Sequence, residues 1–287
     1  MSISDADIVK AASALGLLGS GSQAAHHILA ALCDVNLDTR EITALIQREP
    51  GLAARVLKVA NSAYYGHSRH IATLDRALMV LGLDAVRGIT AAACLDRSIA
   101  RGSRAAGIDP RALVNHCVAS AFAAEQLARR SGKGVAPEAF MGALLHDFGV
   151  PVQERLDPAG MEALIEALRT RPEADPAELE RTLVQVDRAR CTQAIFLSWN
   201  MPESILLAAR FYSDPARSTL PARTQATLVH VGVQLALEAG FTYPLEPRQL
   251  RVPREPLLES LGLNSKVAAE IAEGLAERVL LLAENPA

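Results

Sequence analysis

The chain has 287 residues, half of them hydrophobic and 21% charged, with a formal net charge of −3. This length suits one large or two smaller domains, and the composition does not indicate disorder. Because there is no basic excess, the charge gives no support for nucleic-acid binding. No apolar run approaches the roughly 20 residues of a membrane span, and the N-terminus lacks a signal-peptide pattern. We therefore expect a cytoplasmic protein with no membrane span and no nucleic-acid partner.

The four cysteines stand far apart, each in apolar surroundings: Cys33, Cys94, Cys117 and Cys191. No CxxC pair is present, so the sequence contains neither a zinc ribbon nor a thioredoxin-like motif. Buried free thiols in a reducing compartment are the expected state of these residues.

Helix signals fill the N-terminal part of the chain. Asp38 and Glu41 have capping-box spacing before the apolar run ITALI, and Pro50 opens a segment with apolar residues at the helical period. GSGSQ at 19–23 indicates a flexible break; it is not a phosphate-binding loop, because no lysine followed by Ser or Thr comes after it. Residues 1–100 are predicted to form an N-terminal helical bundle.

The middle of the chain also predicts helices. Asp109 and Asp175 each precede a proline, which is typical of a helix N-cap followed by proline in the first turn. Gly132 is a plausible stop. Helices are expected over 111–130, 138–148, 182–199 and 203–212, within a helical subdomain that spans residues 101–240, joined to the first part through the mixed segment 95–110.

The last part of the chain, residues 241–287, is predicted to be a proline-rich loop and a C-terminal helix. The stretch 241–256 is polar and rich in proline, and it indicates a long surface loop. Nowhere does the sequence show a sustained period-two pattern or an Asn-Gly or Asp-Gly hairpin turn. The predicted fold class is therefore all-α.

Four motifs, in order along the chain, resemble the HDOD family, the HD-related output domains of bacterial signalling proteins. They are NSAYYG at 61–66, LDRALMVLG at 74–82, LLHDFG at 144–149 and FLSWNMPESI at 196–205. The resemblance covers roughly residues 12 to 240. It implies an N-terminal helical bundle packed on a subdomain like that of HD phosphohydrolases.

In HD enzymes, a histidine on one helix meets a His-Asp pair on another, and a later aspartate completes a metal site that activates water. By this resemblance the metal candidates are His116, His146 and Asp147. On a helix, neighbouring residues point about 100° apart, so the pair can share an ion only in the wedge between them. His230 is a fourth candidate ligand.

Several positions depart from the enzyme pattern. Val233 stands where the late aspartate would fall, and Val150 replaces a frequent lysine. Arg188 and Arg210 stand where catalytic relatives place histidines. A guanidinium donates no lone pair and repels a metal ion.

The resemblance therefore implies a non-catalytic signalling output or scaffold protein that acts through protein contacts, not an enzyme. The alternative is a metal-dependent phosphohydrolase that acts on a nucleotide or cyclic dinucleotide. For the His-Asp cluster, three interpretations stay open: a working metal site, a buried hydrogen-bond network, and a metal bound without turnover. No cofactor is required, and a divalent metal is the one that the residues allow. The implied partners are signalling proteins, with components of cyclic-dinucleotide pathways among them.

NSAYYG is the candidate interaction motif. Asn61 is expected to end a helix and tolerates left-handed geometry, and Gly66 permits a turn. Tyr64 and Tyr65 combine apolar rings with polar tips. One interpretation is a helix cap with packing between the two subdomains, and the other is a surface for a partner or ligand.

Overall fold

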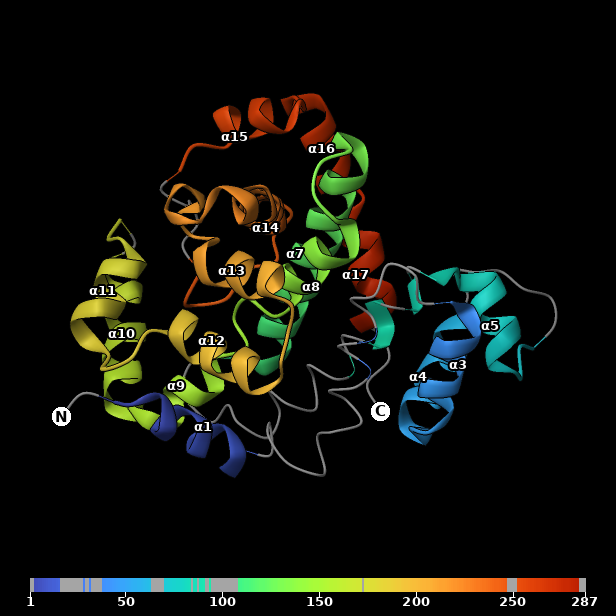
Figure 1. Cartoon of the computed structure of the whole chain (residues 1–287), viewed down its shortest axis with the longest axis horizontal. Helices are drawn as coiled ribbons and strands as arrows, with labels where there is room; N and C mark the ends of the chain where they lie inside the picture. Colours follow the sequence, from blue (N-terminus) through green and yellow to red (C-terminus); the bar gives the residue numbers. More distant parts are fainter. Residues whose placement is uncertain are drawn as a thin grey trace.

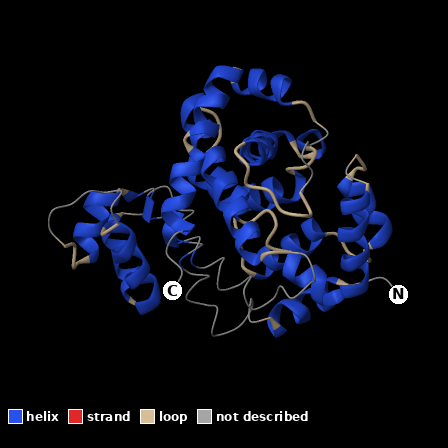
Figure 2. Ribbon diagram, turned by 180° about the vertical axis from the view of Figure 1, so that it is seen from behind, coloured by secondary structure: helices blue, strands red, loops and turns tan. Residues whose placement is uncertain are grey.

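The computed structural model describes residues 3–15, 28, 31, 38–62, 70–83, 85–86, 88–90, 93, 108–171, 173–246 and 252–283. Within these residues the chain forms fifteen α-helices and one short 3₁₀ helix, without a strand, as the all-α prediction requires (Figure 2). None of the described helices is both long enough and apolar enough to cross a membrane.

Three of the described N-terminal helices form a separate group. They are α3 (Thr39–Gln47), α4 (Pro50–Ala60) and α5 (Leu74–Leu81), and they pack on one another at one end of the molecule (Figure 1). The predicted capping box is confirmed: the Asp38 carboxylate accepts the Glu41 N–H at 2.8 Å, and the Glu41 carboxylate accepts the Asp38 N–H at 3.3 Å.

The first helix, α1 (Asp5–Ala14), lies elsewhere. Its buried face packs on α9 (Val150–Leu156) and α12 (Arg188–Ser198), and Arg190 of α12 binds Asp5 at 2.8 Å. This placement differs from the predicted bundle of residues 1–100, because α1 is joined to the HD-like part of the chain.

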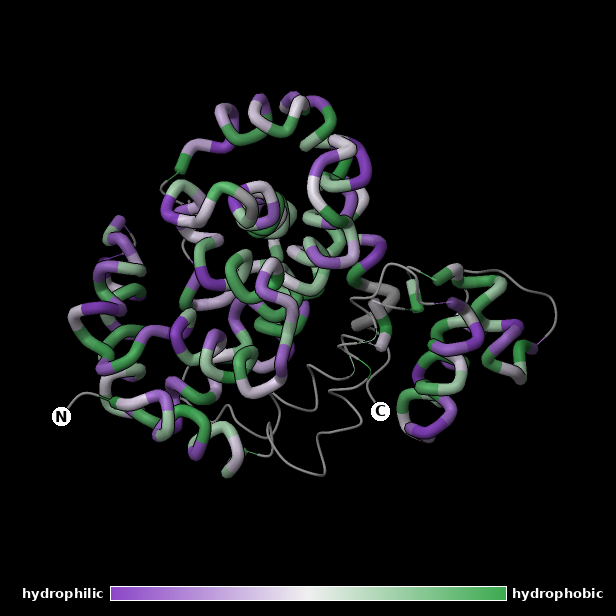
Figure 3. The backbone as a smooth tube through the Cα atoms, viewed as in Figure 1, coloured by the Kyte–Doolittle hydropathy of each residue, from purple (hydrophilic) through white to green (hydrophobic). Residues whose placement is uncertain are grey.

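The centre of the molecule is built from long apolar helices. These are α7 (Pro110–Ser131), α8 (Ala136–Leu144), α13 (Glu203–Phe211) and α14 (Leu220–Glu238), which pack on one another and are rich in hydrophobic residues (Figure 3). The predicted ends of α7 are confirmed. The Asp109 side chain accepts the Arg111 N–H at 3.0 Å, and Gly132 ends the helix with φ 63°.

The helix predicted over residues 182–199 was wrong as a single element. α11 (Pro176–Leu183) ends first, the chain is extended at Val184, and α12 then begins at Arg188 behind its N-cap Asp187. The break is stabilised by Gln153 of α9, whose amide donates to the Val186 carbonyl at 2.8 Å. Between α9 and α11 lies α10 (Pro158–Thr170).

After residue 252 the chain forms three helices, where the sequence predicted one: α15 (Arg254–Leu261), α16 (Ser265–Glu273) and α17 (Leu275–Ala283). The basic end of α7 holds them. Arg130 binds Glu270 at 2.7 Å, and Lys133 donates to the Ser260 carbonyl at 2.7 Å.

Candidate metal centre

The His-Asp pair lies in a tight turn, not on a helix. α8 ends at Leu144, so the helix predicted to reach residue 148 is shorter, and His146 and Asp147 occupy the turn before α9. Thr192 of α12 fixes this turn: its hydroxyl accepts the Gly149 N–H at 2.9 Å and donates to the His146 carbonyl at 3.2 Å. A Cβ on Gly149 would lie 2.2 Å from the Arg188 carbonyl, so the turn and α12 touch at a residue without a side chain.

Two histidines face each other across this turn. The rings of His116, on α7, and His146 lie 5.3 Å apart, and both side chains are buried. Each Nδ1 lies against a backbone carbonyl, that of Phe241 at 2.8 Å for His116 and that of Ala143 at 2.6 Å for His146. Because a carbonyl can only accept, Nδ1 carries a proton in both rings. Nε2 of His116 then presents a lone pair to the cluster, whereas Nε2 of His146 faces the carboxylate of Asp147 at 3.1 Å.

Asp147 joins the histidines to a buried arginine. Its Oδ2 lies 3.1 Å from His146 Nε2 and accepts the hydroxyl of Tyr243, while its Oδ1 lies 3.1 Å from Nε of Arg188. Arg188, predicted only as a departure from the enzyme pattern, is thus a central member of the cluster. The same guanidinium binds Glu246 Oε1 at 3.0 Å and the Leu245 carbonyl at 2.9 Å.

Glu246 is the site residue that the sequence analysis missed. It lies in the segment 241–246, predicted as a surface loop, yet Tyr243, Leu245 and Glu246 are buried over the cluster. The surface-loop prediction was wrong there because this segment covers the polar cluster and satisfies it: the Phe241 carbonyl accepts from His116, and Tyr243 donates to Asp147.

Burial and the neighbouring charges shift the pKa of each titratable group. Burial, aided by His146, lowers the pKa of His116 to about 3. Burial also acts to lower the pKa of His146, but the negative charge of Asp147 outweighs it and raises that pKa. Burial opposes ionisation of Asp147, yet Arg188 and His146 hold its pKa well below the usual range. Burial raises the pKa of Glu246 to about 7, against the lowering effect of Arg188.

Other predicted positions lie away from the cluster. His230 turns both ring nitrogens to backbone carbonyls, of Tyr212 at 2.6 Å and of Val252 at 3.2 Å, and does not join the potential ligands. Val233 is buried in apolar core, and Arg210 binds Asp187 at 2.9 Å.

Among the described residues, the cluster that fits a metal ion consists of His116, His146, Asp147 and Glu246. One ligand atom from each lies within 4.8 Å of the others. Two buried atoms in this set lack a hydrogen-bond partner, Nε2 of His116 and Oε2 of Glu246, whereas Nε2 of His146 lies 3.1 Å from Oδ2 of Asp147. Imidazole and carboxylate are ligands that Zn²⁺, Mn²⁺ and Fe²⁺ accept. The donor set therefore fits one such ion, which would supply Lewis-acid chemistry where a coordination position stays open.

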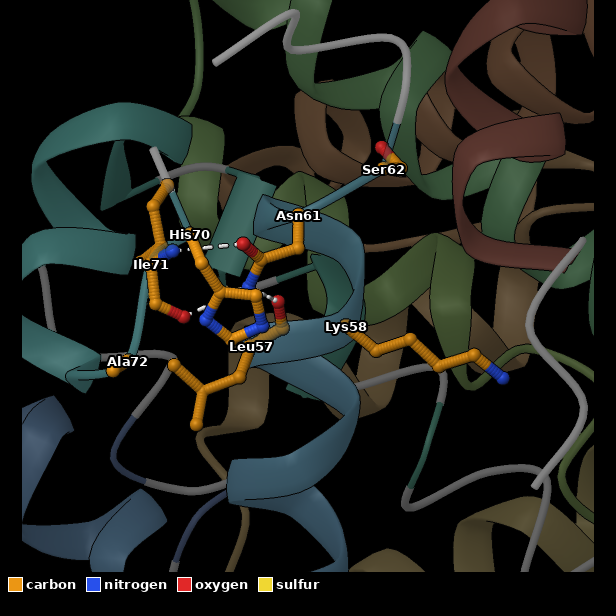
Figure 4. A pocket seen from close by; sticks show the side chains of 7 residues that line it. All are labelled: Leu57, Lys58, Asn61, Ser62, His70, Ile71 and Ala72. Atoms are coloured by element: carbon orange, nitrogen blue, oxygen red, sulfur yellow. Dashed lines mark hydrogen bonds between the residues drawn. The ribbon is translucent and has the colours of Figure 1, made fainter. Parts of the chain in front are cut away.

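The interaction motif is described only at its start. The Asn61 amide donates to the carbonyls of Leu57 and Ile71 and accepts the Ile71 N–H, each at 2.8 Å (Figure 4). Asn61 ends α4, as predicted, with φ −93°, which is outside the left-handed region. Its side chain instead closes the segment between residues 61 and 71. Tyr64, Tyr65 and Gly66 lie outside the described residues, and their proposed role stays a prediction.

This all-helical arrangement, with a buried His and a His-Asp turn on neighbouring elements, defines an HD-type domain. The HDOD domain family model matches residues 18–215, and the chain belongs to this family. An uncharacterized protein of Treponema pallidum (strain Nichols) is 24% identical over 182 residues; the match covers 63% of this chain and 34% of that protein. The chain thus spans about a third of the length of this curated relative.

Solved structures share the fold. A protein of Marinobacter aquaeolei VT8, provisionally named a signal transduction protein, superposes with a TM-score of 0.74 at 23% identity, over 91% of this chain and 57% of that one. An HDOD domain protein of unknown function from Geobacter sulfurreducens gives 0.74 at 19% identity, over 91% of both chains. A Shewanella amazonensis SB2B protein, provisionally named a phosphohydrolase, gives 0.69 at 22% identity, over 97% of both chains.

Proposed function

We propose that this chain is a signalling output or scaffold module that acts through protein contacts and does not hydrolyse phosphoesters. Membership of the HDOD domain family supports the signalling role. Signalling proteins, among them components of cyclic-dinucleotide pathways, are the proposed partners, and the cytoplasm is the proposed location.

One observation carries the non-catalytic part of the proposal: the cluster is closed. His116 and His146 are 0% exposed, Asp147 is 1% exposed and Glu246 is 6% exposed. A hydrolytic metal centre keeps one coordination position open for water and substrate. Here the segment 241–246 covers the cluster, and Arg188 binds Oδ1 of Asp147 and Oε1 of Glu246.

The alternative, a metal-dependent phosphohydrolase, has one observation in its favour. A cleft of about 250 Å³ reaches Arg188 and Tyr212 from the surface, and it is lined by four arginines: Arg181, Arg188, Arg210 and Arg217. Guanidinium groups bind phosphate well. Three carboxylates line the same cleft, those of Glu180, Asp187 and Asp214, and they reduce its attraction for anions.

The two functions are separated by an assay with purified protein. We expect no turnover of cyclic-di-GMP or of an aryl phosphate ester when Mn²⁺ is added. Turnover that is lost in His146→Ala and kept in Arg169→Ala, whose ion pair with Glu166 is exposed, would establish the hydrolase and overturn our proposal. Recovery of a signalling protein by pull-down from the native bacterium, and its loss on mutation of a surface residue, would support the scaffold role.

A further inference from the structure

We infer that the face of α9 and α12 on which α1 packs is a docking site for an amphipathic helix, and that α1 is its exchangeable occupant. We call this face the helix seat. The partner that it fits is a helix of another protein with the chemistry of α1. The inference names the kind of partner for the proposed scaffold role, and it rests on that role to this extent.

The first argument is the spacing of the buried residues of α1 and its C-cap. They lie at positions i, i+3, i+4 and i+7: Ile8, Ala11, Ala12 and Leu15. The opposite face is exposed and includes Asp7, Lys10 and Ser13. Residues at this spacing form one stripe along a helix, and such a stripe anchors the helices that proteins bind as separate peptides. The contact of α1 with the seat is therefore of the kind that a helix from another chain can make.

The second argument is a charged contact at the edge of the helix seat. Arg190 of α12 donates to Oδ1 of Asp5 from Nη2 at 2.8 Å and from Nε at 3.2 Å. The Arg190 side chain is 38% exposed and that of Asp5 is 68% exposed. An apolar centre with a polar, exposed rim is the usual build of a protein interface. Because Asp5 stands three residues before Ile8, the seat fits a helix with an acidic residue one turn before its first apolar anchor.

The third argument is that α1 depends on the seat for its helical structure. It has 10 residues, and isolated helices shorter than about 12 residues are marginal in water. The match to the family model begins at residue 18, so α1 lies outside the matched part, whereas α9 and α12 lie within it. We therefore expect α1 to leave the seat without unfolding of the rest of the domain.

The helix seat adjoins the turn that carries the His-Asp pair. α9 begins at Val150, close behind this turn, and the Thr192 hydroxyl of α12 holds the turn through its contacts with Gly149 and His146. In Figure 1, α1 lies beside both helices. A partner helix that replaces α1 would thus pack on the two elements that position the buried cluster.

The test uses the full chain and, as the probe, a fluorescein-labelled peptide with the sequence of residues 3–15. Ile8→Asp puts a charge on the buried face of α1 and should release it from the seat, which hydrogen exchange detects as loss of protection in α1. The matched control is Ala6→Asp, which adds the same charge on the exposed face. By fluorescence anisotropy we expect the Ile8→Asp chain to bind the peptide at least about tenfold more tightly than the wild type or Ala6→Asp, because its seat is free.

A second probe checks the apolar anchor. A peptide that itself carries Ile8→Asp should bind the Ile8→Asp chain at least about tenfold less tightly than the unchanged peptide. If the Ile8→Asp chain does not fold, Ile8→Ala takes its place, with the same expected order of affinities.

Three results would each overturn the inference. They are continued protection of α1 in the Ile8→Asp chain, equal binding of the peptide by the folded Ile8→Asp and Ala6→Asp chains, and equal binding of the two peptides. Failure of the proposed function is recognised separately. Phosphoester turnover would overturn the non-catalytic role and leave peptide binding unaffected, whereas absence of peptide binding would overturn the helix seat and leave the non-catalytic role intact.

Discussion

Replacement of Arg188 by methionine tests whether the cluster is an ion-paired unit. The side chain is 10% exposed and makes two close charged contacts, with Asp147 at 3.1 Å and Glu246 at 3.0 Å, and a longer one with Glu180 at 3.9 Å. It also donates to the Leu245 carbonyl at 2.9 Å and to the Tyr212 hydroxyl at 3.3 Å. Hydrogen bonds to charged groups contribute about 1.5–3 kcal/mol each, and a neutral one about 1 kcal/mol. These contributions are not additive, and removal of one partner from a buried ion pair typically costs about 3–5 kcal/mol.

We therefore expect Arg188→Met to lower the free energy of unfolding by about 4 kcal/mol, measured by urea denaturation in the presence of a chelator. The control is Arg190→Met, two residues along α12, whose ion pair with Asp5 is largely exposed. That change should cost no more than about 1 kcal/mol. If both variants lose less than about 1 kcal/mol, the guanidinium does not stabilise the buried carboxylates, and the account of the cluster is incorrect.

Three further changes test other parts of the structure. Gly149→Ala should lower the free energy of unfolding by at least about 2 kcal/mol, because the added Cβ would lie 2.2 Å from the Arg188 carbonyl. Gly274→Ala is the control and should be nearly neutral, since its nearest neighbour would be 3.6 Å away. Equal thermal stabilities of the two variants would contradict this. Asn61→Ala removes three hydrogen bonds, so it should lower the free energy of unfolding by about 1–3 kcal/mol and increase proteolysis between residues 61 and 71. Unchanged proteolysis would argue against a stabilising role of these hydrogen bonds. His116 has a pKa of about 3 when folded and about 6.5 when unfolded, so the unfolded chain takes up a proton first as the pH falls. In chelator, the stability of the wild type relative to His116→Gln should therefore decrease by about 1.4 kcal/mol per pH unit between about pH 6 and 4, and a constant difference would contradict the buried neutral histidine.

The sequence correctly predicted the helices whose ends carry capping residues. Asp109 and Pro110 at the start of α7, and Gly132 at its end, act within a few residues of themselves, so their effect can be read locally. The end of α8 could not be predicted in this way. The run LLHDFG has no helix breaker before Gly149, and the turn depends on Thr192, which lies 43 residues further along the chain from Gly149.

The same distinction applies to the site. His116, His146 and Asp147 were found through a motif, and the structure brings them together. Glu246 follows no motif and no periodic pattern, and it reaches the cluster only because the chain returns across it after α14. The role of Arg188 was likewise hidden, since a cation near a candidate metal site indicates repulsion until its carboxylate partners are known.

The cover of the cluster has a consequence for how such domains diverge. His116 on α7 and the turn that holds His146 lie in the part matched by the family model, whereas the Phe241 carbonyl, Tyr243 and Glu246 come after its end at residue 215. Loss or replacement of that short stretch would leave the helical core intact and change the pocket from closed to open. A few residues outside the stretch matched by the family model would thus decide whether the pocket is sealed or accessible, and a fragment cut at residue 215 would differ chemically from the intact chain.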